Sequence, residues 1–326
     1  MSLFKTFDEV KRFIGADANN ELRTIEPYFD DAARDYLVNV LSQDEFDLLE
    51  TNYTNNALTA AQEEILPLAQ NVLANFGYYL FADDGTMQIT DSGFLRLEHT
   101  EAKSAYQWQV RNFKARRWTN GWRAMEKLAK TLYANMNNHV AWRDSEERKL
   151  FNGFFCWHTL QMKKYFRIDN WGTMWALQAE FLRVQEDYIR PLVTVEVYDS
   201  LVADTMEDNL TAKNEPLLPL VQAVQVFGVL KASVLNYGFE FGKDGLASAS
   251  LESTNSNEQV STITPMLERE RLLRVFQGRF NAASCKLKTF LDTNSSATDY
   301  PSYYNKFVNI EKDNTDHNQG KGTFLI

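Results

Sequence analysis

The sequence predicts an all-α protein of two tandem related helical bundles, each with a short β-hairpin or irregular loop excursion. Two observations carry this prediction. Apolar residues recur at helical spacing through most of the chain, as at Ile25, Phe29 and Tyr36. Residues 10–74 also align with residues 162–226 at a constant shift of 152, without a gap. Because a repeated segment of this size is a domain, we expect two copies of one helical unit.

The repeat extends beyond this segment, so we place the first unit at residues 1–160 and the second at 161–326, with an extended C-terminal tail. Later in the chain the best alignment has a shift of 159, which pairs Lys127 with Lys286. The identical pairs at the shift of 152 include Phe29/Phe181, Tyr36/Tyr188, Asp47/Asp199, Pro67/Pro219 and Gln70/Gln222.

Apolar periodicity sets the helices of the first unit. Asn19 and Asn20 are suitable caps for the second of them, and Ser42 precedes the third. Asp83-Asp84-Gly85 is a turn signal, and residues 86–93 alternate apolar and polar side chains like one arm of a hairpin. The predicted helices cover residues 4–14, 22–40, 44–51, 60–81 and 102–136.

The second unit repeats this order. A helix over residues 145–166 is expected to end the first unit and open the second. Aligning Gly85 with Gly245 requires a shift of 160, which places eight extra residues before the hairpin of the second unit. The last long helix is predicted at 266–291. We expect residues 247–262 to form a mobile loop, and the polar tail from 311 to be extended or ordered by a partner.

Composition places the chain among soluble globular proteins. It has 326 residues, 44% of them hydrophobic and 24% charged, and a net charge of -10. This charge argues against a protein that coats nucleic acid generally. Cys156 and Cys285 lack metal-ligand spacing, and we expect both to be buried free thiols in a reducing compartment. No signal peptide is visible, and residues 216–239 are interpreted as a buried core helix and not as a membrane span.

No arrangement of residues indicates catalysis. The four histidines have no metal-ligand spacing, and His158 is interpreted as a packed histidine. The segment Gly320–Thr323 lacks the first glycine of a phosphate-binding loop. Pairs such as Glu63-Glu64 stand at helix starts, where they favour the helix dipole. We therefore predict no enzyme, no catalytic, cofactor-binding or metal-binding residues, and no cofactor.

One basic and aromatic segment, residues 106–130, is a candidate contact surface for nucleic acid or a partner. Aromatic rings can stack on bases while cations contact phosphate. The alternative is an amphipathic helix whose aromatic side chains pack inward and whose basic side is solvated or paired with acidic neighbours. The second unit keeps the basic residues of this segment but not its tryptophans. The candidate contact residues are Arg111, Lys114, Arg116, Arg117, Trp118 and Arg123.

The segment Tyr188-Ile-Arg-Pro-Leu192, followed by Val197-Tyr-Asp-Ser-Leu201, resembles the opening helix pair of head–tail connector (adaptor or neck) proteins of tailed phages. The first unit carries a weaker form in residues 36–40 and 46–49. Residues 60–81 and 88–93 also resemble an uncharacterised helical family of Bacteroidetes phages and prophages. The doubled chain departs from a typical small adaptor.

The resemblance implies a structural virion protein of the phage neck, assembled in the cytoplasm of the bacterial host. It implies a homo-oligomeric ring, roughly 12-fold, closed by heterologous contacts. Its partners would be the portal protein and other neck or tail proteins, with double-stranded DNA passing through the lumen without sequence specificity and no membrane. The alternative function is a helical nucleic-acid-binding protein that uses residues 106–130.

Overall fold

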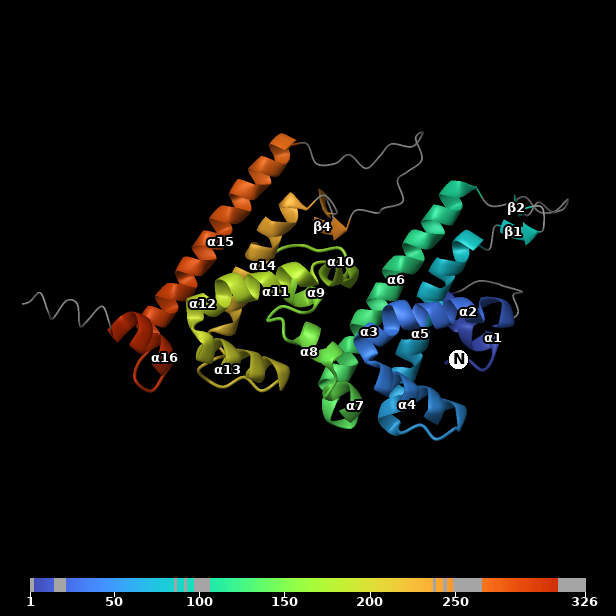
Figure 1. The fold of residues 1–326 in the computed structure, drawn as a ribbon, viewed down its shortest axis with the longest axis horizontal. Helices are drawn as coiled ribbons and strands as arrows, with labels where there is room; N and C mark the ends of the chain where they lie inside the picture. Colours follow the sequence, from blue (N-terminus) through green and yellow to red (C-terminus); the bar gives the residue numbers. More distant parts are fainter. Residues whose placement is uncertain are drawn as a thin grey trace, which may run out of the picture. The chain divides into compact units, whose positions relative to one another are not determined.

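The computed structural model divides the chain into two compact units, Met1–Leu150 and Phe151–Ile326 (Figure 1). It describes residues 3–14, 22–84, 87–90, 93–96, 106–236, 239–242, 245–248 and 266–309. Within these ranges the prediction of an all-α protein with two related units is confirmed, because two short hairpins are the only paired strands described. The boundary between the units lies ten residues before the expected division between residues 160 and 161.

The first unit is organised around a pair of long helices, α5 and α6, which lie side by side (Figure 1). The helices α1 and α2 pack on α5, and β1 pairs with β2 in an antiparallel hairpin. In chain order the elements are α1 (Phe7–Ile14), α2 (Leu22–Ala32), the π-helical turn η1 (Ala33–Leu37), α3 (Val38–Leu41), α4 (Gln43–Thr54), α5 (Ala60–Asp84), β1 (Met87–Thr90), β2 (Gly93–Arg96), α6 (Gln107–Ala134), η2 (Met136–Asn138), α7 (Val140–Arg143) and α8 (Glu146–Asn152).

The second unit has the same plan around the long pair α14 and α15. Its elements are α9 (Thr159–Lys163), α10 (Trp171–Ala176), α11 (Gln178–Val184), the π-helical turn η3 (Gln185–Ile189), α12 (Arg190–Val193), α13 (Val195–Met206), α14 (Leu218–Leu235), β3 (Phe239–Gly242), β4 (Gly245–Ser248), α15 (Met266–Asn294), α16 (Pro301–Tyr303) and η4 (Tyr304–Val308).

The backbone repeats at the shift of 152 residue by residue. The turns η1 and η3, the helices α3 and α12, and the helices α4 and α13 begin and end at equivalent positions. Ser42 and Thr194 both take a positive φ, of 66° and 77°, and so do Asn56 and Asp208, at 54° and 50°. A β-branched threonine seldom adopts such a backbone. Its presence shows that the bend before α4 and α13 is a fixed feature of the fold.

One buried hydrogen bond also occurs twice. The Gln70 side chain donates from Nε2 to the Leu3 carbonyl at 2.7 Å, and Gln222 donates to the Phe155 carbonyl at the same distance. Both members of the second pair stand 152 residues after those of the first. Each bond ties the segment that enters the unit to its first long helix, so this buried polar contact has been duplicated along with the apolar core.

The expected single helix over residues 145–166 is wrong. The chain leaves α8 after residue 152 and enters α9 at residue 159, with extended and bent backbone between them. Side chains of α14 provide the reason. Gln222 takes the Phe155 carbonyl, and Gln225 accepts the Cys156 amide at 2.8 Å. These bonds satisfy buried backbone groups that a helix would otherwise have paired.

The expected hairpin register is also wrong. Strands β1 and β3, and strands β2 and β4, coincide at the shift of 152, so Gly245 corresponds to Gly93 and not to Gly85. Gly245 has a φ of 93°, and a Cβ there would lie 2.1 Å from the Arg167 carbonyl oxygen. Glycine is therefore required at this turn. The extra residues of the second unit follow its hairpin, between β4 and α15. Most of the loop predicted at 247–262, and the tail from 311, lie outside the described residues.

Candidate functional site

The helix α6 carries the predicted contact residues, and the structure distributes them over two faces. Tyr106 precedes the helix, and its amide donates to the side chain of Gln109 at 3.0 Å, which caps the first turn. Arg117 and Lys114 are buried, and Trp118 is half-buried. The other three candidates are exposed, namely Arg111, Arg116 and Arg123.

Arg117 is a structural residue of the first unit. Its guanidinium donates to the Ile14 carbonyl at 3.0 Å, to the Asn75 side chain at 3.2 Å and to the Phe13 carbonyl at 3.5 Å. A cation suits the last turn of α1, where carbonyl groups lack helical partners. Burial, and then the charge of Arg116, lower the pKa of the Arg117 side chain. Arg117 thus fixes α1 to the long helix pair and is not available to phosphate.

Trp118 belongs to an aromatic cluster inside the unit. Its ring meets Tyr36 at 5.9 Å and Phe76 at 5.7 Å edge-on, and it lies 5.0 Å from Tyr79. Trp122 completes the cluster, 5.6 Å from Trp118. Edge-to-face contacts at these distances stabilise packed aromatic residues. These tryptophans are core residues, as the inward-packing alternative expects, and they do not form a platform for bases.

Lys114 is a second basic residue that α6 turns toward the interior. Its Nζ lies 4.9 Å from the centre of the Tyr79 ring, in a cation–π contact. The aliphatic stem is buried with it, since the residue is only 7% exposed. Lys114 therefore contributes to packing, and the outward basic face of α6 is narrower than the sequence suggests.

The exposed side of α6 keeps both charge and an aromatic residue. Trp108 is 53% exposed at the start of the helix, and Tyr106 just before it is 65% exposed. Arg116, Arg123 and Lys127 follow at helical spacing that places them along one side of the helix. This outward side is what remains of the candidate contact surface.

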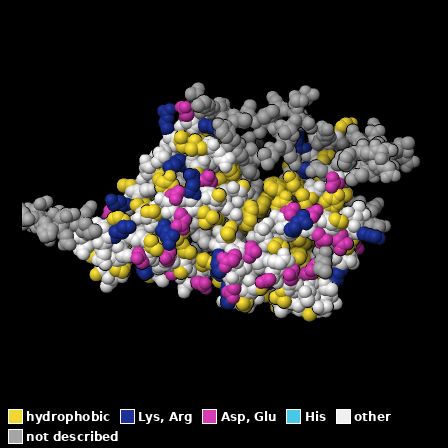
Figure 2. Space-filling model, viewed as in Figure 1, with side chains coloured by type: hydrophobic (Ala, Val, Ile, Leu, Met, Phe, Trp, Pro, Cys, Tyr) yellow, Lys and Arg dark blue, Asp and Glu magenta, His cyan; other side chains and the backbone are white. Residues whose placement is uncertain are grey.

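The equivalent helix of the second unit, α15, has a longer basic face. Figure 2 shows Lys and Arg side chains along this part of the surface. Val275, Gly278 and Ala282 lie between them and are also exposed. Cys285 is exposed too, which corrects the expectation that both thiols are buried, because its position on the helix falls on the outer side. The exposed basic residues are Arg271, Arg274, Arg279, Lys286 and Lys288.

A buried hydrogen-bonded pair of polar side chains escaped the sequence analysis. Glu45 on α4 and His139 before α7 join at 2.8 Å between Oε1 and Nδ1, with side chains 2% and 1% exposed. The second unit has the buried Val197 in place of Glu45. Because the two residues are 94 positions apart, no local pattern could reveal the pair. A buried pair of this kind holds its two elements together, since removing one partner leaves the other polar group in the core without its hydrogen bond.

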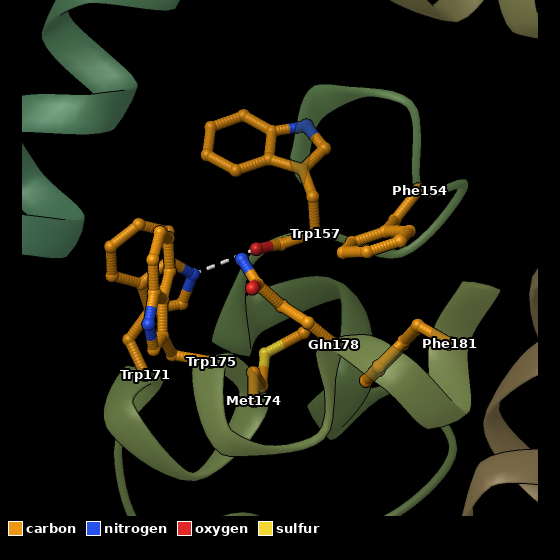
Figure 3. Close-up of a pocket in the computed structure, with 7 residues that line it drawn as sticks. All are labelled: Phe154, Trp157, Trp171, Met174, Trp175, Gln178 and Phe181. Atoms are coloured by element: carbon orange, nitrogen blue, oxygen red, sulfur yellow. Dashed lines mark hydrogen bonds between the residues drawn. The ribbon is translucent and has the colours of Figure 1, made fainter. Parts of the chain in front are cut away.

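The second unit contains an aromatic hollow that the sequence analysis also missed (Figure 3). Trp171 donates from Nε1 to the Trp157 carbonyl at 2.7 Å. The hollow has about 220 Å³ of empty volume, including space open to solvent, but its enclosed part holds only about one water molecule. The lining residues are Phe154, Trp157, Trp171, Met174, Trp175, Gln178 and Phe181.

No group of three or more His, Cys, Asp or Glu side chains that could hold a metal ion occurs among the described residues. The helix α14 is long and apolar enough to cross a membrane, but 61% of its residues are buried inside the protein. Such burial is typical of a core helix, as the sequence analysis expects of residues 216–239.

Comparison with known families gives one match. The model of a family of unknown function, DUF6712, matches residues 17–152 and 189–309. The chain belongs to the DUF6712 family. The two matched regions correspond closely to the two units, in agreement with the tandem duplication. No curated protein and no solved structure matches the chain.

Proposed function

We propose that this DUF6712 chain is a structural protein of the phage neck, which forms a ring between portal and tail through which DNA passes. The observation that carries the proposal is the duplication itself. The helices α3 and α4 and the hairpin of the first unit begin and end at the same equivalent residues as α12, α13 and the hairpin of the second unit. The side chains that face outward nevertheless differ between the two units. A conserved scaffold with two different surfaces suits a subunit that meets different neighbours with its two halves.

The exposed charges are consistent with this role. The outward sides of α6 and α15 are basic, in a chain whose net charge is -10. Basic faces on an otherwise acidic subunit can bind acidic surfaces of neighbours, while the acidic remainder repels DNA and keeps it from binding tightly. Heterologous contacts between such unlike faces generate rings when the rotation closes.

The resemblance to connector proteins adds a second line of support. Tyr188 lies on the turn η3 and Leu201 on α13, so the resembling segment covers the bend at Thr194 where η3 and α12 pass into α13. The same bend recurs at Ser42 in the first unit. A connector-type ring would use this rigid corner in both halves of each subunit.

The test is co-purification of the full chain with the portal protein of the same phage. A tagged portal ring is expected to retain the chain at a fixed ratio, and electron microscopy is expected to show an added tier. The same portal with its tail-facing surface removed is the control. A chain that never joins a ring with portal or tail proteins would contradict the proposal.

The alternative, a nucleic-acid-binding protein, is favoured by one feature, the exposed Trp108 beside Arg111 on the outer side of α6. The appropriate test is Arg116→Glu with Arg123→Glu, because both are exposed, whereas Arg117 is buried in the fold. If the alternative holds, the slope of DNA affinity against salt falls by about two.

The matched control for this test is Arg12→Glu with Arg23→Glu, since both arginines are exposed on other helices of the same unit. It introduces the same change of charge away from α6. Equal binding by both double variants, or no binding of wild type at low salt, excludes the α6 surface as a nucleic-acid site.

A further inference from the structure

The outer face of α15 has the composition of a docking surface. Val275 is 43% exposed in its middle. In the part of the chain that the structure describes, nothing lies within 4 Å of a Cβ built at Gly278. Arg274, which is exposed and pairs with Glu270 at 3.5 Å, flanks these residues on one side. Arg279, also exposed, flanks them on the other side, and its guanidinium lies 5.7 Å from the centre of the Phe227 ring. The face therefore offers an open apolar centre between two arginine side chains.

The helix α4 of the first unit presents the complementary pattern. Leu48 is 46% exposed, although most leucines of the unit are buried. Asp44 and Asp47 stand beside it and are both exposed. Positions 44, 47 and 48 lie on one side of a helix, so the leucine and the two carboxylates form one ridge. This ridge has a protruding apolar side chain and negative charge, whereas α15 has a glycine with open space around it and positive charge.

We propose that the α15 face of one copy of this chain packs on the α4 ridge of a second copy. In this contact Leu48 packs against Val275 and Gly278. Asp44 and Asp47 form ion pairs with Arg274 and Arg279. The proposal deepens the ring function proposed above and depends on self-association. Glycine at the crossing lets two helix backbones approach closely, and the unlike charges fix which faces meet.

The contact is heterologous, because a face in the second unit meets a ridge in the first. Each copy thus keeps one unused α15 face and one unused α4 ridge after a pair has formed. Association can continue from both ends and closes into a ring if the rotation between copies permits. In a symmetric dimer, by contrast, both copies would bury the same surface in one interface, and association would stop at two copies.

The other acidic helix, α13, makes a useful contrast. It carries Glu196 and Asp199 at the positions equivalent to Asp44 and Asp47, and both are exposed. The position of Leu48 is taken by the partly buried Ser200, and the exposed apolar residue of α13 is instead Val195 in its first turn, so the apolar side chain lies elsewhere relative to the two carboxylates. Charge alone between exposed side chains stabilises little. The contact is therefore assigned to α4, and reversal of the two α13 carboxylates provides the matched control.

The experiment is sedimentation velocity of the full chain at micromolar concentration and low salt, with folding checked by circular dichroism. Wild type is expected to associate, and salt is expected to weaken the association. Arg274→Glu with Arg279→Glu, and separately Asp44→Lys with Asp47→Lys, should each raise the dissociation constant by more than about tenfold, because like charges then face each other.

Three further variants make the test specific. Joining both reversals in one chain restores opposite charges and should restore association. Glu196→Lys with Asp199→Lys should leave it unchanged. Gly278→Leu should block association while the protein stays folded, because the site is open in the subunit. Cys285 lies on the same face, so its reaction with a maleimide should slow on association.

The outcomes separate the two proposals. A wild type that sediments as a monomer at every concentration overturns the α15–α4 contact, and portal binding still decides the neck function. Oligomers that survive all of these substitutions overturn the contact while leaving a ring intact. If only the α13 reversal abolishes association, the contact is made by α13, and its assignment to α4 is wrong.

Discussion

The ring of Phe76 lies against Gly121, and the second unit has the same arrangement with the two partners exchanged. A Cβ on Gly121 would come within 2.8 Å of the Phe76 ring. The equivalent of Phe76 is Gly228, and the equivalent of Gly121 is Phe280. A Cβ on Gly228 would lie 3.2 Å from the Phe280 ring. The long helices of both units thus enclose one aromatic ring and one glycine, and the total volume is preserved.

Substitution by leucine is expected to have opposite effects on stability at Gly121, which is enclosed, and at Gly278, which is exposed. Gly121→Leu should lower the free energy of unfolding by about 3 kcal/mol, because the added side chain overfills the space held by Phe76. Gly278→Leu should raise it by up to about 1 kcal/mol, since leucine favours a helix over glycine and meets no neighbour. Chemical denaturation measures both.

Exchanging Phe76 and Gly121 tests more strictly whether the two residues share one space. Phe76→Gly combined with Gly121→Phe copies the arrangement of the second unit. Its cost should be smaller than the sum of the two single changes, as expected for residues in contact. Simple additivity would show that the two positions do not share one space.

Loss of the Arg117 side chain should release α1. Arg117→Met keeps most of the apolar volume but removes the bonds to the Ile14 carbonyl and to Asn75, which should cost about 2–3 kcal/mol. Amide hydrogen exchange is expected to rise over residues 7–14. Arg116→Met is the control, because Arg116 is exposed and its replacement should change stability by less than about 0.5 kcal/mol.

Acid should weaken both units through carboxylates that accept hydrogen bonds. Burial alone would raise the pKa of Glu9, but bonds from Tyr53, Lys5 and Thr6 together hold it below its ordinary value of 4.5. Burial alone would also raise the pKa of Asp204, but hydrogen bonds from Thr211 and Asn214 outweigh it and lower this pKa. A carboxylate whose pKa is lower in the folded than in the unfolded protein contributes stability at pH values above the unfolded-state pKa. This contribution is lost as the pH falls through the folded-state pKa.

The corresponding measurement is the denaturation midpoint between pH 6 and pH 3. Wild type should lose stability below about pH 4.5, and Glu9→Gln should show a shallower decline. Glutamine is already the natural residue at the equivalent position, where Gln161 accepts the Trp157 amide at 2.9 Å. An unchanged slope in the variant would remove Glu9 from this explanation.

The two cysteines should differ sharply in reactivity. Cys156 is buried, and burial raises the pKa of its thiol, so little thiolate forms near neutral pH. Cys285 is exposed on α15. One fast thiol and one that reacts only after denaturation are expected with a maleimide. Cys285→Ser should eliminate the fast reaction, and two fast thiols would contradict the described packing.

Much of the fold followed from the sequence because helical periodicity and the repeat reinforce each other. The identical pairs over residues 10–74, among them Asp47/Asp199, indicated the shift of 152, and the helices α4 and α13 start 152 residues apart. The hairpin register failed because Gly85 follows acidic residues and resembles a turn, whereas the glycine that the backbone requires is Gly245 opposite Arg167. That requirement arises from a contact nearly eighty residues away along the chain.

The candidate site was predictable only in part for a similar reason. Alternation of basic and aromatic residues located α6, but the inward turn of Lys114 and Arg117 depends on Tyr79 and on the end of α1. A helical pattern assigns charged residues to the solvent side, and it cannot anticipate a buried arginine that closes another helix. The pair of Glu45 and His139 left no local signal at all.

Native mass spectrometry of the full chain assembled with its portal tests the central claim most directly. We predict an added mass equal to a whole multiple of 37.7 kDa, with the number of copies set by the symmetry of a closed ring. A portal that adds no mass, with the chain remaining at 37.7 kDa in every condition, would contradict the assignment to the neck.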